Sequence, residues 1–215
     1  MKKYISEFLC TYFLVFIGTG SVIVNEQTNG AVGLVGIALS FGFIVVCMIY
    51  SFGNVSGAHM NPAVSIALAC IKKMPLSDLL PYIISQFVGG IAASITLKIL
   101  FPTNDMLGAT LPSGTVLQSF IMEFIATFLL MTVIVNVALS SNNNKQLAGI
   151  VIGLCVIVIV FVAGPISGGS VNPIRSLAPA IVGGHYQCWW LYTVAPILGT
   201  ISASYLYTYL LHQQK

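Results

Sequence analysis

Charged residues are scarce in this chain of 215 residues. Asp, Glu, Lys and Arg make up 6% of it, whereas soluble globular proteins carry about 25%. The eight basic and five acidic residues give a net charge of +3, but the basic residues form no patch, so we expect no nucleic-acid partner. Hydrophobic residues make up 57%, and the mean hydropathy is +0.97. The composition indicates a protein of the lipid bilayer.

Metal-ligating and nucleophilic side chains are also few. The five cysteines show neither a disulfide framework nor a Cys/His ligand spacing. An intramembrane enzyme needs a nucleophile–base pair or a metal cluster, and the three histidines do not form one. We therefore expect no enzyme, no metal and no cofactor.

Six apolar runs are long enough to cross a membrane, because a spanning helix needs about 17–25 residues. The first run follows two lysines and lacks a cleavage pattern after it, so we interpret it as a retained span and not as a signal peptide. The sequence predicts an all-α membrane protein with spans at roughly 5–24, 33–53, 79–100, 116–139, 147–164 and 188–211.

The dipeptide Asn-Pro occurs twice, in SGAHMNPAV (Asn61, Pro62) and in SGGSVNPIR (Asn172, Pro173). Each copy precedes a short apolar stretch of about eleven residues, which as a helix rises about 16 Å. That is half of a hydrocarbon core of about 30 Å. Paired short segments at matching places in two halves of a membrane protein indicate a transport pathway.

The two halves of the chain are similar to each other. The motif Glu-Phe-x-x-Thr begins at Glu7 and again at Glu123, and each Asn-Pro segment follows the second span of its half. Because each half has three spans, the halves must lie in opposite orientations, and the two half-helices meet near the middle. We predict one channel domain, 1–215, with repeat one at about 1–108 and repeat two at about 115–215.

The distribution of lysine predicts the orientation. With both half-helices returning to their own side, both termini and the links after spans two and four share one face. By the positive-inside rule this face is cytoplasmic. It carries Lys2, Lys3, Lys72, Lys73, Lys145 and Lys215, and the other face carries Lys98, Glu26, Asp105 and His185.

Asn is a preferred helix N-cap and Pro suits the first turn of a helix. Each half-helix is therefore expected to start at its Asn, with the positive ends of both helix dipoles converging and amide N–H groups left for a passing solute. The preceding loops would be non-helical backbone lining a watery path. These pore-lining residues are Gly57, Ala58, His59, Met60, Gly168, Ser170 and Val171; a gate is the alternative role for His59.

Three charged residues lie at membrane depth. Arg175, the chain's single arginine, stands three residues after Asn172 and shares a face of the half-helix with it. A charge at this depth is a functional hypothesis by default. Glu7 and Glu123 are expected to accept hydrogen bonds from the two loops, and proton coupling is the alternative.

These residues resemble the major intrinsic proteins, the family of aquaporins and aquaglyceroporins. The resemblance covers essentially the whole chain. It implies six helices plus two reentrant half-helices with an inverted three-plus-three repeat (the aquaporin fold), a passive pore in each subunit, no cofactor and a homotetramer in the plasma membrane.

The resemblance also implies the site residues. The central motif is formed by Asn61, Pro62, Ala63, Asn172, Pro173 and Ile174, and the selectivity constriction by Phe41, Val160, Gly169 and Arg175. Strict water channels usually have His where Val160 stands, so Val160 and Gly169 should widen the ring. The motif AGPISGGS with Val160 and the pair Tyr192-Thr193 is similar to nodulin-type intrinsic proteins and their bacterial relatives.

Two positions depart from the family pattern. Glycerol facilitators usually carry Asp after the arginine, where this chain has Ser176. The second motif reads Asn-Pro-Ile and not Asn-Pro-Ala, and Ile174 is expected either to narrow the centre of the pore or to change the packing of the half-helices.

The expected function is a passive channel for water and small uncharged solutes, glycerol-like polyols above all. A water-selective channel is the alternative within the same class. A transporter coupled to protons through Glu7 or Glu123 is the alternative from another class.

Overall fold

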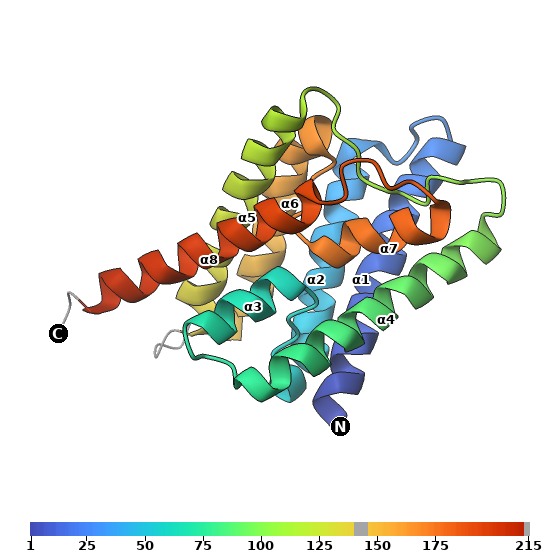
Figure 1. Cartoon of the computed structure of the whole chain (residues 1–215). Coiled ribbons are helices and arrows are strands. Elements are labelled where there is room, and N and C mark those ends of the chain that lie inside the picture. The colour runs from blue at the N-terminus through green and yellow to red at the C-terminus, as the bar shows by residue number, and fades with distance from the viewer. Residues whose placement is uncertain (140–145, 213–215) are drawn as a thin grey trace.

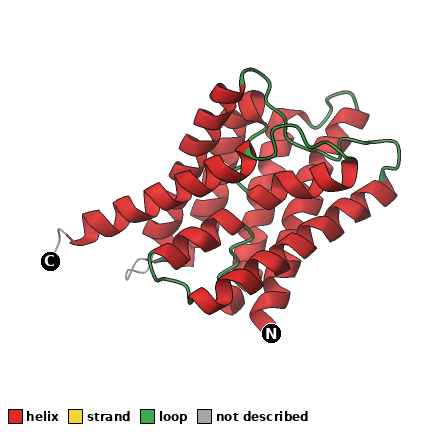
Figure 2. Ribbon diagram, in the orientation of Figure 1, coloured by secondary structure: helices red, strands yellow, loops and turns green. Residues whose placement is uncertain are grey.

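The computed structural model describes residues 1–139 and 146–212, with the side chains of residues 211 and 212 excepted. The predicted cytoplasmic residues Lys145 and Lys215 lie outside the described residues. The described chain is helical, with helices joined by loops (Figure 2). The helices are α1 (Lys2–Gln27), α2 (Gly33–Ser56), α3 (Pro62–Cys70), α4 (Leu76–Leu100), α5 (Val116–Ala138), α6 (Ala148–Ser167), α7 (Pro173–Gly183) and α8 (Leu191–His212).

Six of these helices are long and two are short, as the sequence predicts. Helices α1, α2, α4, α5 and α6 are long and apolar enough to cross a membrane. Helix α8 is less apolar, because its 22 residues include serines, threonines and tyrosines, but its length of about 33 Å is sufficient. Helices α3 and α7 have 9 and 11 residues, so each reaches only part of the way.

The two halves of the bundle are interlocked. Helix α1 packs along α4, α5 packs along α8 in the same way, and α2 meets α6 between them. Each half-helix packs against a long helix of the other half, α3 against α8 and α7 against α4. In Figure 1 both short helices lie between α4 and α8. This is the inverted three-plus-three arrangement of the aquaporin fold.

Glycine permits the closest helix contacts at equivalent places in the two halves. A Cβ atom added to Gly89 of α4 would lie 2.4 Å from the carbonyl oxygen of Phe8, and one added to Gly199 of α8 would lie 2.5 Å from that of Phe124. No side chain fits there, because the obstructing atom belongs to the backbone. Small residues of this kind are what membrane helices use to approach each other.

Polar contacts show which ends of the helices share a face. Lys3 Nζ lies 2.5 Å from Asp78 Oδ2, which places the start of α1 beside the start of α4. Tyr50 donates a hydrogen bond of 2.8 Å to the Gln146 carbonyl, which places the end of α2 beside the start of α6. The described lysines at 2, 3, 72 and 73 thus lie on one face.

The opposite face has its own contacts. The Asn104 amide donates a hydrogen bond of 2.8 Å to Glu26, and Lys98 donates one of 2.7 Å to Asp105. This ammonium lowers the pKa of the Asp105 carboxyl, because it stabilises the ionised form. The single described lysine of this face is therefore paired with a carboxylate.

Candidate functional site

Each half-helix begins at its Asn-Pro pair. Asn61 and Asn172 have nearly identical extended backbones, with φ of −152° and −153°. Asn61 Oδ1 accepts a hydrogen bond of 3.0 Å from the Ala63 N–H, and Asn172 Oδ1 accepts one of 3.0 Å from the Ile174 N–H. The N-cap geometry follows from the residue types, since the amide oxygen satisfies a backbone donor that the first turn leaves free.

The two half-helices are joined through the same asparagines. Asn61 Nδ2 donates a hydrogen bond of 2.8 Å to the Val171 carbonyl, and Asn172 Nδ2 donates one of 2.7 Å to the Met60 carbonyl. An amide nitrogen carries two hydrogens. One hydrogen of each asparagine therefore holds the opposite loop, and the other has no partner among the described residues.

The loops before the asparagines adopt a left-handed backbone that few residues tolerate. Gly57 and Gly168 end α2 and α6, and both have a φ of 85°. Met60 and Val171 have φ of 53° and 48°. This left-handed region is uncommon for residues other than glycine, and it is least favourable for a β-branched residue such as Val171. Surrounding contacts must therefore hold these loops in place.

Glu7 supplies these contacts for the first loop. Its carboxylate accepts hydrogen bonds of 2.9 Å from the N–H groups of His59 and Met60. The Ser56 hydroxyl donates a third, of 2.7 Å, and Gln86 Nε2 a fourth, of 2.8 Å. Glu7 is fully buried and does not line the cavity described below.

Glu123 does the same for the second loop. It accepts hydrogen bonds of 2.8 Å from the Ser170 N–H, 2.7 Å from the Val171 N–H and 2.6 Å from the Ser167 hydroxyl. It too is fully buried and absent from the cavity lining. The hydrogen bonds from the loops that the sequence predicts for both glutamates are present.

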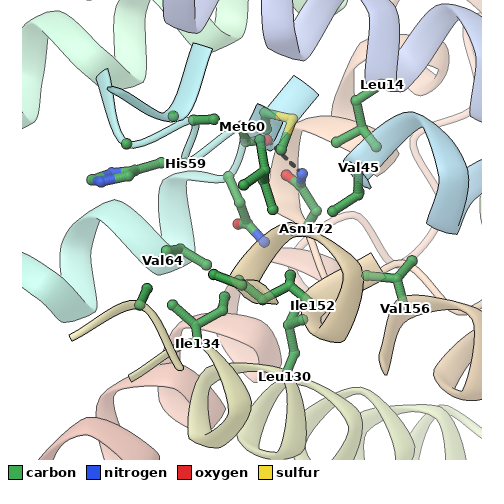
Figure 3. Close-up of a pocket in the computed structure, with 18 of the residues that line it drawn as sticks. Leu14, Val45, His59, Met60, Val64, Leu130, Ile134, Ile152, Val156 and Asn172 are labelled. Carbon is green, nitrogen blue, oxygen red and sulfur yellow. Dashed lines mark hydrogen bonds between the residues drawn. The ribbon is translucent and has the colours of Figure 1, made fainter. Parts of the chain in front are cut away.

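A cavity of about 570 Å³ runs between the two loops and the long helices. Backbone and side chains from 57–61 and 169–172 line one side. Figure 3 shows the Asn172 amide among apolar side chains, with its hydrogen bond to Met60 as a dashed line. The apolar lining residues, which sequence analysis did not name, include Leu14, Val45, Leu130, Ile134, Ile152 and Val156.

The four residues of the expected constriction all line this cavity. Arg175, Phe41 and Val160 are 4–5% exposed, and the Arg175 guanidinium carbon lies 4.9 Å from the centre of the Phe41 ring. At this distance the cation interacts with the π face of the ring. Arg175 Nη1 also donates a hydrogen bond of 2.7 Å to the Gly108 carbonyl.

Four members of the central motif do not border the cavity: Pro62, Ala63, Pro173 and Ile174 are absent from its lining. Ile174 Cγ2 instead lies against α4, where a Cβ atom added to Gly90 would be 2.4 Å away. At the equivalent place in the other half, the Thr200 hydroxyl donates a hydrogen bond of 3.0 Å to the Ala63 carbonyl. Of the two effects expected of Ile174, the structure favours altered packing, because Ile174 faces Gly90, whereas the smaller Ala63 faces Thr200.

Gly168 also lies behind the cavity and not in its wall. A Cβ atom added there would lie 2.9 Å from Thr110 Cγ2. The other expected loop residues are in the lining.

The cavity extends to the face that carries Lys72 and Lys73, with Tyr50, Asn54, Lys73 and Gln146 in its lining. Sequence analysis did not assign these four to the site. Lys73 belongs to the basic loop from which the sequence predicted the orientation in the membrane. Its position there was the one signal in the sequence that could have placed it near the mouth of the cavity. Gly108 was also missed, since nothing in its spacing relates it to Arg175.

Six spanning helices with two half-helices that meet beside a solute-sized cavity define a membrane channel. The family model of the major intrinsic protein family matches residues 1–207. The chain is 44% identical to "Aquaporin NIP1-2" of Arabidopsis thaliana over 100% of this chain and 76% of that protein. It is 41% identical to "Nodulin-26" of Glycine max over 100% of this chain and 80% of that protein.

A solved structure is similar over nearly the whole chain. The aquaglyceroporin from Plasmodium falciparum matches with a TM-score of 0.85 and 27% identity, covering 96% of this chain and 94% of that one. The chain belongs to the major intrinsic protein family, and the expected nodulin-type resemblance is confirmed. It is a channel and not an enzyme.

Proposed function

We propose that this chain is a passive channel for water and small uncharged solutes such as glycerol, with Phe41, Val160, Gly169 and Arg175 as its selectivity constriction. The observation that carries the proposal is the cavity of about 570 Å³, whose lining contains all four residues. Relatives named aquaporins and a solved aquaglyceroporin support the same solute class.

The two sides of the constriction suit a polyol. Phe41 and Val160 present carbon to the path, whereas Arg175 presents nitrogen donors. Arg175 lines the cavity, and its guanidinium has further N–H donors besides the one that bonds to Gly108, so a solute hydroxyl can accept from it. Because Gly169 has no side chain and Val160 is small, the ring leaves room for a carbon chain beside the hydroxyls.

The charge of the lining favours neutral solutes. Lys73 and Arg175 line the cavity, and no described lining residue is Asp or Glu. Both half-helices also direct their positive ends to the centre. Cations and protons therefore meet a positive potential along the path, as in other channels of low proton permeability.

The test is stopped-flow light scattering on proteoliposomes that contain the purified protein. Glycerol entry and water efflux should both exceed those of empty liposomes. Val160→Trp should suppress both, because the indole fills the ring. Val158→Trp is the matched control: Val158 lies on the same helix but is 55% exposed on the outer surface, so both fluxes should stay unchanged.

The alternatives give different results in the same preparation. Fast water efflux with glycerol entry at the level of empty liposomes would indicate a water-selective channel. Accumulation of glycerol driven by a pH gradient, lost on Glu7→Gln or Glu123→Gln, would indicate proton coupling. Equilibration without accumulation supports the passive channel, in agreement with the buried positions of both carboxylates.

We further propose a homotetramer in the plasma membrane with both termini cytoplasmic. Cys70 is exposed on the face that carries Lys72 and Lys73. An impermeant maleimide should label it in inverted vesicles and not in intact cells; the reverse would place this face outside. The mass of the purified protein, corrected for detergent, should equal four chains.

A further inference from the structure

The orientation of the Arg175 guanidinium depends on a segment outside both half-helices. Its Nη1 donates a hydrogen bond of 2.7 Å to the Gly108 carbonyl, and Gly108 belongs to the connection between α4 and α5, residues 101–115. The position of this carbonyl therefore helps to set the direction of the guanidinium. What holds the connection in place also positions the arginine.

The first half of this connection is anchored to α1 and α4. Leu107 is fully buried and packs with Ile23 and Leu97. Gly108 lies so close to α1 that a Cβ atom added there would be 2.8 Å from the Thr19 carbonyl. These contacts fix residues 107 and 108 against α1, α4 and the end of α7, where Val182 packs against the same cluster.

Thr110 ties the same connection to α7. Its hydroxyl shares a hydrogen bond of 2.6 Å with the hydroxyl of Ser176, the residue after the arginine. Ser176 shares a second, of 2.5 Å, with Ser170, which donates to the Asn172 carbonyl at 2.9 Å. Thr110, Ser170 and Ser176 are 3–6% exposed. A buried chain of hydroxyls thus joins the connection to the loop that carries Gly169 and to the half-helix that carries Arg175.

The first half of the molecule has a different arrangement at the equivalent serine. Ser65 and Ser176 each stand four residues after their asparagine. Ser65 bonds to His59 Nδ1 at 2.9 Å and accepts from Gln86 Nε2 at 3.1 Å, so its outer partner comes from helix α4. In the second half the outer partner is Thr110, from a connection. In the half that carries the arginine, this link therefore reaches the α4–α5 connection.

We propose that Thr110 is a positioning residue for Arg175, acting through its hydrogen bond to Ser176 and through the Gly108 carbonyl two residues before it. The proposal rests on the proposed role of Arg175 in the constriction. A hydrogen bond in a buried site of low dielectric is strong and resists competition from water. Without it the connection loses its hydrogen bond to the half-helix beside Arg175, and Arg175 samples orientations open to the path.

The first test uses the chemistry of arginine. Arg175 is the only arginine in the chain, so modification by 2,3-butanedione in borate, located by peptide mass, reports on this residue alone. Thr110→Val and Ser176→Ala should each raise its labelling rate about threefold to tenfold, the effect of losing one hydrogen bond. Thr110→Ser retains the hydroxyl and should label at the rate of the unmodified protein.

Thr132→Val is the matched control. Among the residues that the structure describes, the Thr132 hydroxyl bonds only to the Phe128 carbonyl within α5. Thr132 does not line the cavity, so the labelling rate should stay unchanged. Equal rates in Thr110→Val, Ser176→Ala and the unmodified protein would overturn the proposal. So would an equal rise in Thr132→Val, because it would indicate general loosening.

A second readout separates this proposal from the proposed function. In stopped-flow measurements Thr110→Val should raise the ratio of glycerol entry to water efflux, and Thr110→Ser should restore it. If the unmodified protein passes no glycerol, the polyol function fails, whereas the labelling rates still decide whether Thr110 holds Arg175. An unchanged ratio with faster labelling would remove Arg175 from the constriction but keep its dependence on Thr110.

Discussion

Ile174 stands where the family pattern has alanine, and its environment gives a prediction that separates packing from pore width. Its side chain is 3% exposed, does not line the cavity and lies against Gly90 of α4. Ile174→Ala should therefore destabilise the protein but leave the ratio of glycerol entry to water efflux within about twofold of the original, because the path is not widened.

The expected loss of stability follows from the volume removed. Three carbons occupy about 80 Å³, and at about 24 cal/mol per Å³ of cavity the free energy of unfolding falls by about 2 kcal/mol. The transfer of these carbons from water adds little, since the detergent or lipid around an unfolded membrane protein is as apolar as the core. Thermal unfolding in detergent, followed by intrinsic fluorescence, measures the change.

The reciprocal change is Gly90→Ala. A Cβ atom added to Gly90 would lie 2.4 Å from Ile174 Cγ2, which is too close without movement, and overpacking of this kind costs about 1–3 kcal/mol. In the double variant the new methyl group lies in the space that the isoleucine left. The two single effects should therefore not add, with a coupling of at least about 1 kcal/mol.

Gly20→Ala is the matched control, since its added Cβ atom would meet only Leu97 Cδ2 at 3.3 Å. Gly20→Ala should lower the free energy of unfolding only slightly, and its effect should add to that of Ile174→Ala. Two results would refute the reasoning. A rise in glycerol entry of more than about threefold in Ile174→Ala would mean that the side chain borders the path. Additive effects of Gly90→Ala and Ile174→Ala would mean that the two positions do not share a space.

Four further predictions concern the constriction itself, and each is read out in proteoliposomes. Val160→His should lower glycerol entry on the order of tenfold and spare water efflux, because the imidazole fills the wide side of the ring; equal glycerol entry would remove Val160 from it. Arg175→Val should raise proton leak, measured with an internal pH dye, and an unchanged leak would place the barrier elsewhere. Gly18→Ala should reduce both fluxes, since the added Cβ atom would lie 2.1 Å from Phe41 Cε1 and push the ring toward the arginine; unaltered fluxes would show that the ring moves the other way. Mercurial inhibition should be weak, because Gly169 offers no thiol and no described lining residue is cysteine, and strong block would locate a thiol near the path.

Much of the fold could be read from the sequence because bilayer constraints are simple. A span must be apolar over a fixed length, so five of the six spans stand out by composition alone. Helix α8 is less apolar than the other five, and its apolar run at 188–211 was long enough for the sequence to predict it as a span. The half-helices were found through Asn61 and Asn172, because their capping requirements are local.

The buried carboxylates were predictable for a related reason. Glu7 and Glu123 recur at matching places in the two halves, and a buried carboxylate needs several donors. Loops with left-handed residues present unpaired N–H groups, so the two requirements satisfy each other.

Contacts between distant segments were decided by the tertiary structure alone. Ile174 meets Gly90 and Thr110 meets Ser176, and neither pair has a fixed spacing that a pattern could reveal. Gly108 becomes a partner of Arg175 only because the α4–α5 connection folds back over α7. The sequence by itself determined the spans, the repeat and the asparagine caps, since these depend on local chemistry and membrane thickness. The packing of the half-helices and the support of the arginine depend on which surfaces meet, and only the folded chain decides that.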